Sequence, residues 1–220
     1  MKLFDEFDSE EMEESGKIYG VVMAVVSNNK DDEGLGRVKV DFPWRSEDND
    51  ESHWSRVSTL MAGRGRGSFF IPEVGDEVLV AFEHGNVEHP VIIGSLWNGK
   101  DKPPETNKDG KNNIRKIKSR SGHEIIFNDD KEGKKEKIEI HTNAGHKVVL
   151  DDTQGKEKIE IVDKTGSNKM VIDSVKKAIN IESEQQLTIK AQKVEIEGTM
   201  SLTLKSNANL TIQGLPVKIN

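Results

Sequence analysis

The sequence contains no cysteine, few aromatic residues and no long apolar run. The lack of cysteine excludes disulfides and thiolate metal sites. Aromatic residues make up 5% of the 220 residues and hydrophobic residues 33%, both low for a compact globular chain. Because no stretch of about 18 apolar residues occurs, we expect no transmembrane helix. The sequence therefore predicts neither a disulfide scaffold nor a membrane-spanning helix.

These deficits are concentrated in the second half of the chain. Beyond Phe127 the sequence contains no aromatic residue and a single proline, Pro216. Ahead of this change, the segment 100–113 is rich in proline, glycine, asparagine and charge, which is typical of a linker. The predicted organisation is an acidic tail (1–16), a first domain (17–99), a linker (100–116) and a repeat region (117–220).

Negative charge is also unevenly distributed. Residues 1–15 contain seven acidic residues against Lys2, and this tail accounts for most of the net charge of −7. Such a tail is usually only a solvated, solubilising segment. The alternative, suggested by its Phe4 and Phe7, is docking onto a partner. An acidic start is not a signal peptide, so we expect synthesis in the cytoplasm without export by that route. No basic stripe predicts a nucleic-acid surface.

Residues 17–99 alternate between β-rich runs and turn clusters, which predicts a small all-β domain. The five β-rich runs are 18–26, 36–42, 54–60, 76–82 and 90–97. Five strands in about 80 residues suit a closed barrel, and the OB-fold is the commonest five-stranded solution. The glycine-rich stretch 63–67 follows no phosphate-loop pattern and is expected to be a turn between strands.

The region after the linker is a repeat whose apolar residues recur at every second position, so it predicts strands rather than helices. Toward the C-terminus its units are about eight residues long, whereas upstream units are longer and carry polar turns such as 129–137 and 151–158. The predicted core positions are Met170, Ile172, Ile179, Ile181, Leu187, Ile189, Val194, Ile196, Leu202, Leu204, Leu210 and Ile212.

Each unit has too small an apolar core to be stable in a single chain. Two aliphatic side chains stabilise by about 2 kcal/mol each when fully buried, whereas ordering eight residues costs on the order of 8–16 kcal/mol. A single-chain solenoid is possible, but a unit of eight residues corresponds to only one face of it. Three chains intertwined around a three-fold axis would each supply one face. We therefore expect a narrow homotrimeric β-helix needle rather than an antiparallel meander.

The ordered signature of the first domain resembles a known family. The segments GLGRVKVDFPW (34–44) and HWSRVSTLMAGRGRGSFFIPEVGDEVLVAFEHGNVEHPVIIGSLWNG (53–99), followed by 118–142, are similar to the central spike proteins of contractile injection machines. This family includes phage baseplate assembly protein V, VgrG-like type VI secretion spikes, tailocin spikes and extracellular injection systems. The resemblance implies an OB-fold collar on a trimeric β-helix that is driven through the target cell envelope when a sheath contracts.

Partners follow from the resemblance. A tail hub would lie above the OB domain, and because no hub-like segment precedes the barrel we expect the hub to be a separate protein, with Phe4 and Phe7 as candidate contacts. At the other end, a separate tip protein of the proline–alanine–alanine–arginine repeat (PAAR) family would cap the chain. The candidate tip contacts are Leu215, Pro216, Val217 and Ile219. Alternatively, these residues plug the trimer's own end.

No enzymatic constellation is evident, so we expect no catalytic residues, cofactor or metal site. His84 and His89 flank a turn without a third ligand, and no histidine follows His146, which excludes the apical iron site of some phage spikes. No paired-carboxylate site or nucleophile motif occurs. The alternative function is an OB-fold module that binds an oligosaccharide or nucleic acid on a trimeric β stalk, for which Trp44, Trp54 and Trp97 would be candidate stacking residues.

Overall fold

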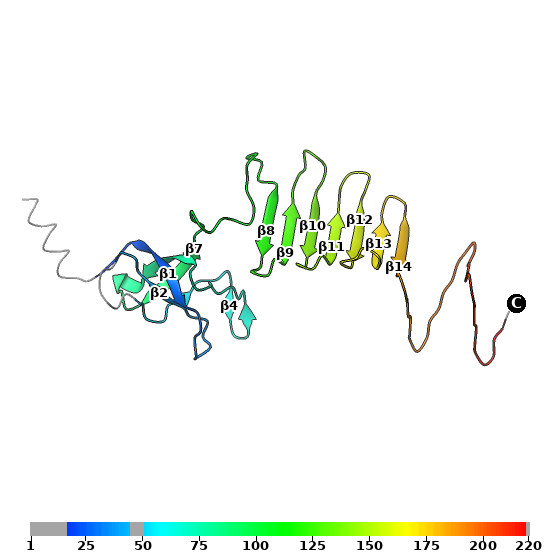
Figure 1. The fold of residues 1–220 in the computed structure, drawn as a ribbon, viewed down its shortest axis with the longest axis horizontal. Helices are drawn as coiled ribbons and strands as arrows, with labels where there is room; N and C mark the ends of the chain where they lie inside the picture. Colours follow the sequence, from blue (N-terminus) through cyan, green and yellow to red (C-terminus); the bar gives the residue numbers. More distant parts are fainter. Residues whose placement is uncertain (1–16, 45–50, 219–220) are drawn as a thin grey trace, which may run out of the picture. The chain divides into compact units, whose positions relative to one another are not determined.

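The computed structural model describes residues 17–44 and 51–218 (Figure 1). Within them, all regular secondary structure is strand except one short 3₁₀ turn, η1 (Glu83–Gly85). The predicted all-β class is therefore confirmed. The chain divides into two compact units between Thr106 and Asn107. Over the described ranges we find no helix with the length and apolarity that a membrane crossing requires.

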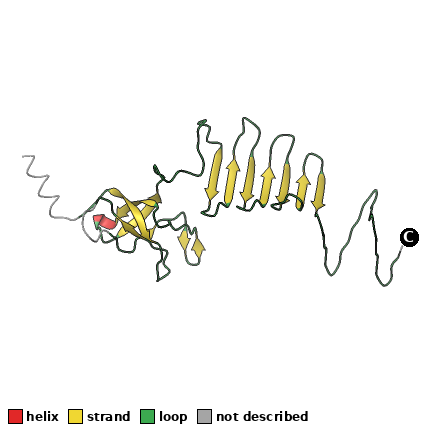
Figure 2. Ribbon diagram, viewed as in Figure 1, coloured by secondary structure: helices red, strands yellow, loops and turns green. Residues whose placement is uncertain are grey.

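The first unit contains a curled sheet of five strands (Figure 2) in the order β2-β1-β6-β7-β3. Its strands are β1 (Val21–Asn28), β2 (Lys39–Asp41), β3 (Arg56–Val57), β6 (Glu77–Phe82) and β7 (Pro90–Ser95). Neighbouring strands are antiparallel except β3 and β7, which are parallel. Each strand overlaps one of the five β-rich runs, because alternating β-branched residues between turn clusters specify both its position and its buried face.

The two ends of this strand order meet and close the sheet. Val38, just before β2, forms an antiparallel bridge with Ser55, just before β3. The Val38 amide donates to the Ser55 carbonyl at 3.0 Å, and the Ser55 amide donates back at 2.7 Å. Closure removes the free sheet edges that would otherwise be exposed to other chains.

Alternate residues of the curled sheet fill the barrel. The core residues are Ala24, Val26, Val38, Val40, Phe42, Val78, Val80, Phe82 and Ile92. The rings of Phe42 and Phe82 lie 5.8 Å apart. The glycine-rich stretch forms a short hairpin of β4 (Ala62–Gly63) and β5 (Arg66–Gly67), as expected for a turn between strands.

The second unit contains a seven-stranded antiparallel sheet in which every strand pairs with its neighbours in the chain. The strands are β8 (Ile114–Lys118), β9 (Glu124–Asn128), β10 (Lys137–His141), β11 (Lys147–Asp151), β12 (Lys158–Val162), β13 (Lys169–Asp173) and β14 (Ala178–Glu182). All seven are five residues long and are paired over their whole length. β8 begins within the segment 100–116 that was expected to be a linker.

The argument against an antiparallel meander is wrong as far as Glu182, because β8–β14 pair with one another within one chain. Met170, Ile172, Ile179 and Ile181, assigned to an intertwined needle, lie on β13 and β14, which pair with each other within one chain. The reason lies in the turns. Each of the six connections between β8 and β14 contains one residue with a positive φ angle, where the chain reverses, whereas the described residues 183–218 contain none.

Backbone conformation marks these reversals. Positive φ angles, which favour glycine, occur in the connections at Gly122, Lys134, Gly145, Gly155, Gly166 and Lys177. Gly198, in the eight-residue units, has no positive φ, but a Cβ there would collide with the carbonyl oxygen of Ser201. Gly198 lies directly before the bend at residues 199–200.

Successive turns along one edge of the second sheet are linked by a repeated side-chain contact. His123 ends the β8–β9 turn, and its Nδ1 accepts a hydrogen bond from the Asn143 amide in the β10–β11 turn. His146 Nδ1 accepts from the amide of Lys164 in the next turn on that edge, also at 3.2 Å. Asn168 Oδ1 likewise accepts a hydrogen bond from the amide of Glu184, which follows β14. Each turn is therefore fastened to the next by one side-chain acceptor.

Replacing His146 by leucine is expected to lower the free energy of unfolding by about 0.5–1.5 kcal/mol, because the Lys164 amide loses its acceptor. Chemical denaturation of variants in the same assembly state would measure the loss. The His146→Asn variant is the control, since Asn168 makes the equivalent contact with an amide oxygen. Equal losses in both variants would contradict this role for His146.

Candidate functional surfaces

One face of the β8–β14 sheet consists almost entirely of aliphatic side chains. In each five-residue strand the second and fourth residues share this face, because side chains alternate along a strand. On β10 these are Ile138 and Ile140, and on β12 they are Ile159 and Ile161. The uniform register aligns such residues across the sheet, so that Ile161 lies opposite Val148 on β11 and Met170 on β13.

This alignment produces two rows of apolar residues, the first across all seven strands and the second from β9 to β14, where it ends beside Arg115 of β8. The first row is Ile117, Ile125, Ile140, Val148, Ile161, Met170 and Ile181. The second row is Phe127, Ile138, Leu150, Ile159, Ile172 and Ile179. The apolar surface therefore runs across all seven strands.

The aliphatic face is more exposed than the opposite face, which is the reverse of an ordinary half-buried sheet. Ile140 is 45% exposed and Ile161 51%. On the opposite face the side chain of Glu139 is only 12% exposed; it forms an ion pair with Lys137 and lies against the imidazole of His141. Soluble proteins rarely leave a contiguous apolar surface uncovered, so this face has the character of an interface.

The same face contains an open groove of about 490 Å³ with a mainly apolar lining. Ile140, Ile161, Met170 and Ile181 from the first row contribute to it, together with Leu187 beyond the last strand. Such a groove accommodates apolar side chains rather than a charged ligand.

Beyond β14, residues 183–218 contain no strand and every residue is exposed. Figure 1 shows this segment leaving the sheet as a succession of extended stretches separated by bends. Its eight predicted core residues, Leu187, Ile189, Val194, Ile196, Leu202, Leu204, Leu210 and Ile212, are 53–67% exposed. Extended backbone without a sheet partner is open to pairing with a strand of another chain.

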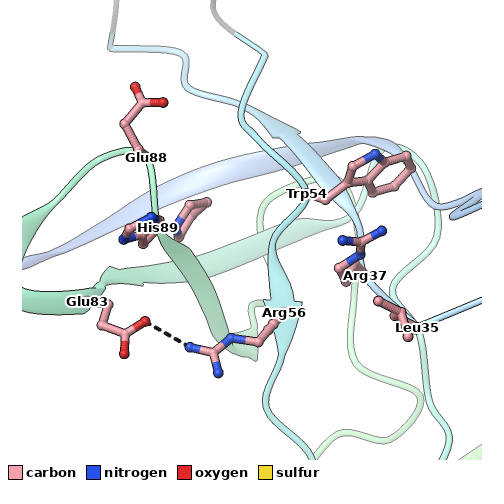
Figure 3. A pocket seen from close by; sticks show the side chains of 8 residues that line it. Leu35, Arg37, Trp54, Arg56, Glu83, Glu88 and His89 are labelled. Atoms are coloured by element: carbon pink, nitrogen blue, oxygen red, sulfur yellow. Dashed lines mark hydrogen bonds and ion pairs between the residues drawn. The ribbon is translucent and has the colours of Figure 1, made fainter. Parts of the chain in front are cut away.

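A different kind of site lies on the barrel. A pocket of about 480 Å³ opens there, and Figure 3 shows Arg37, Trp54 and Arg56 on one side with Glu83, Glu88 and His89 on the other. Arg37 and Trp54 point outward because their neighbours Val38 and Ser55 are buried. The indole of Trp54 has the Arg37 Cζ 5.7 Å and the Lys39 Nζ 5.5 Å from its ring centre, which is cation–π distance.

Asp31 holds the edge of this pocket in place. Its carboxylate accepts hydrogen bonds from the backbone amides of Glu33, Leu35 and Arg37 and from the Arg37 guanidinium, whose Nη2 lies 2.8 Å from Oδ1. The hydrogen bond with the Arg37 side chain is the main reason that the pKa of Asp31 lies well below its ordinary value. This ring of contacts fixes the β1–β2 loop and positions Arg37.

The candidate residues predicted from the sequence do not lie together at one site in the structure. Phe4, Phe7 and Ile219 lie outside the described residues. Leu215 and Val217 are exposed at the end of the described chain. Trp44 and Trp97 are 48% and 70% exposed and do not line the pocket, whereas Trp54 does. Among the described residues no group of three or more histidines, aspartates and glutamates is arranged to hold a metal ion.

Comparison with known protein families identifies the type of domain that the barrel represents. Residues 22–97 match the model of the type VI secretion system/phage-baseplate injector OB domain. The first unit is therefore an OB domain of the injector type, and the resemblance to the VgrG-like baseplate spike family is confirmed.

Individual relatives are type VI secretion system spike proteins. Spike protein VgrG1c of Pseudomonas aeruginosa is 38% identical over 94 residues, which is 40% of this chain and 13% of the relative. VgrG4b of the same species is 33% identical over 134 residues, which is 50% of this chain and 16% of the relative. VgrG3 of Vibrio cholerae is 40% identical over 75 residues, 33% of this chain and 7% of the relative. The chain thus spans only a small part of the length of these relatives.

Proposed function

We propose that this chain is the homotrimeric central spike of a contractile injection machine, joining the tail hub to a needle that is driven through the target cell envelope. The uncovered aliphatic face of the β8–β14 sheet, following an injector OB domain, is the observation that carries this proposal. The protein works by rigidity rather than by catalysis, and needs no cofactor.

Three-fold assembly accounts for the uncovered face. Each copy contributes its β8–β14 sheet as one wall of a triangular prism, with the two aliphatic rows inside and the ion-paired face outside. Small and medium aliphatic side chains suit so narrow an interior, and charged residues such as Glu139 and Glu160 remain in contact with water through their lysine partners. A closed prism also buries the apolar surface completely, so that no apolar surface remains to bind further chains.

The segment 183–218 continues the needle by a different arrangement. Its described residues form no strand and contain no positive-φ reversal, so their backbone groups pair with those of the other two chains, and the chains intertwine. The glycine at the Gly198 bend fits the turn from one face of the prism to the next. We therefore place the β-helix proper in this C-terminal part rather than along the whole region 117–220.

The two ends of the chain meet separate partners. At the N-terminal end, Phe4 and Phe7 of the acidic tail contact the tail hub. At the C-terminal end, Leu215, Pro216, Val217 and Ile219 form the platform for a PAAR-type tip protein, and the fully exposed side chain of Leu215 supports this assignment. The trimer is made in the cytoplasm, is assembled into a phage tail, tailocin or injection particle, and contacts the target membrane only transiently.

Deleting the gene from its host and imaging the sheathed particles tests this function. We expect particles whose baseplate lacks the central spike density and which no longer kill or inject target cells. Complementation with the full chain should restore both, whereas a chain ending at Asn113 should restore neither, because it has no needle. Complete and active particles in the deletion strain would overturn the proposal.

A further inference from the structure

The pocket around Trp54 occupies the part of the barrel that ligands use in other OB-folds. Its residues come from the entry to β2, from the segment leading into β3 and from the loop between β6 and β7. In OB-folds the corresponding strands 2 and 3, with the loops beside them, bind oligonucleotides and oligosaccharides. A volume of about 480 Å³ lies within the range of small-ligand sites. This position alone is an analogy of fold, so the ligand has to be argued from the side chains.

The charges of the pocket are balanced rather than positive. The Arg37 guanidinium is paired with Asp31 at 2.8 Å, and the Arg56 guanidinium with Glu83 at 3.0 Å. The Glu88 carboxylate lies against the imidazole of His53. A nucleic-acid groove requires an excess of cations to neutralise phosphates, and no such excess occurs here. The paired charges therefore disfavour a polyanion.

Balanced donors and acceptors around an aromatic ring suit a neutral polyhydroxyl ligand. Each sugar hydroxyl both donates and accepts, so it can bridge a guanidinium such as that of Arg56 and a carboxylate such as that of Glu83. The partly exposed indole of Trp54 offers an apolar surface to the C–H groups of a sugar ring. Asp31 already fixes the neighbouring loop, so little ordering is needed on binding.

We propose that the Trp54 pocket of the OB domain binds a neutral oligosaccharide, with Trp54 stacking on a sugar ring and Arg56, Glu83 and His89 holding its hydroxyls. This activity is separate from the spike function, because all the residues that line the pocket belong to the first unit.

Titration of the full chain with linear tetrasaccharides of glucose, mannose and N-acetylglucosamine tests the proposal. Isothermal titration calorimetry should show saturable binding to at least one of them, with a dissociation constant of about 1 mM or below. The Trp54→Ala variant should weaken binding at least about tenfold, and Arg56→Ala by about three- to tenfold. No saturable binding of any of the three sugars at about 10 mM would overturn the proposal.

Trp97→Ala is the matched control, because Trp97 is 70% exposed on the same unit but does not line the pocket. Equal losses in the Trp54 and Trp97 variants would refute the location. Arg56→Ala covers the case in which Trp54→Ala fails to fold, since the Arg56 side chain is 67% exposed and its loss alters only a surface pair. A twelve-nucleotide oligothymidylate should not bind. If it binds more tightly than any of the sugars, the ligand of the pocket is a nucleic acid and the saccharide proposal is wrong.

Discussion

Replacing Ile161 by aspartate is expected to leave the protein as single chains at concentrations where the unaltered chain is a trimer. Ile161 lies in the middle of the first aliphatic row, opposite Val148 and Met170, and is 51% exposed in the single chain. In the proposed prism its burial stabilises by about 2 kcal/mol per chain. An unpaired buried carboxylate adds a penalty of several kcal/mol, and three-fold symmetry repeats this loss in every copy.

Mass photometry or sedimentation velocity would measure the outcome, with the unaltered chain expected at three times 24.6 kDa. Val175→Asp is the matched control, because Val175 is 52% exposed but lies in the β13–β14 turn, outside the aliphatic rows. That variant should remain a trimer. If Ile161→Asp also assembles fully, or if the unaltered chain is a monomer, the aliphatic face is not the trimer interface.

Ending the chain after Asn113 is expected to yield a folded monomer. The barrel has its own core of nine residues and a closed strand order, so it does not depend on the second unit for burial. Losing β8–β14 removes every aliphatic row, and with it the apolar area that would drive association. Circular dichroism should retain a β spectrum with a cooperative thermal transition, while the mass falls to that of one chain.

A second truncation, after Glu182, separates the two parts of the needle. It retains the aliphatic face but removes residues 183–218, so we expect a trimer that dissociates at lower temperature than the full chain. Intertwined chains resist dissociation because they must unwind together, whereas three packed sheets can separate as units.

A stable trimer from residues 1–113 would show that the barrel, and not the needle region, drives assembly.

The sequence predicted the barrel well because its information is local. Runs such as 76–82 alternate buried and exposed residues between turn clusters, and β6 occupies the same residues with Val78, Val80 and Phe82 inside. The family signature in residues 34–99 gave the same domain independently. Trp54 could be proposed as a stacking candidate, but its pocket could not, because Glu83 and Glu88 reach it from a loop that is distant in sequence.

The sequence by itself determined that the second region is a strand repeat with two aliphatic positions in each unit and too few large side chains for a closed single-chain core. Only the tertiary structure decided how the units pair. Connections of four to eight residues, each with one positive-φ residue, let β8–β14 fold back within one chain, whereas the described residues 183–218 contain no such residue and are extended. Periodicity sets which side chains share a face, but whether a neighbouring strand comes from the same chain depends on whether the backbone between the strands reverses direction.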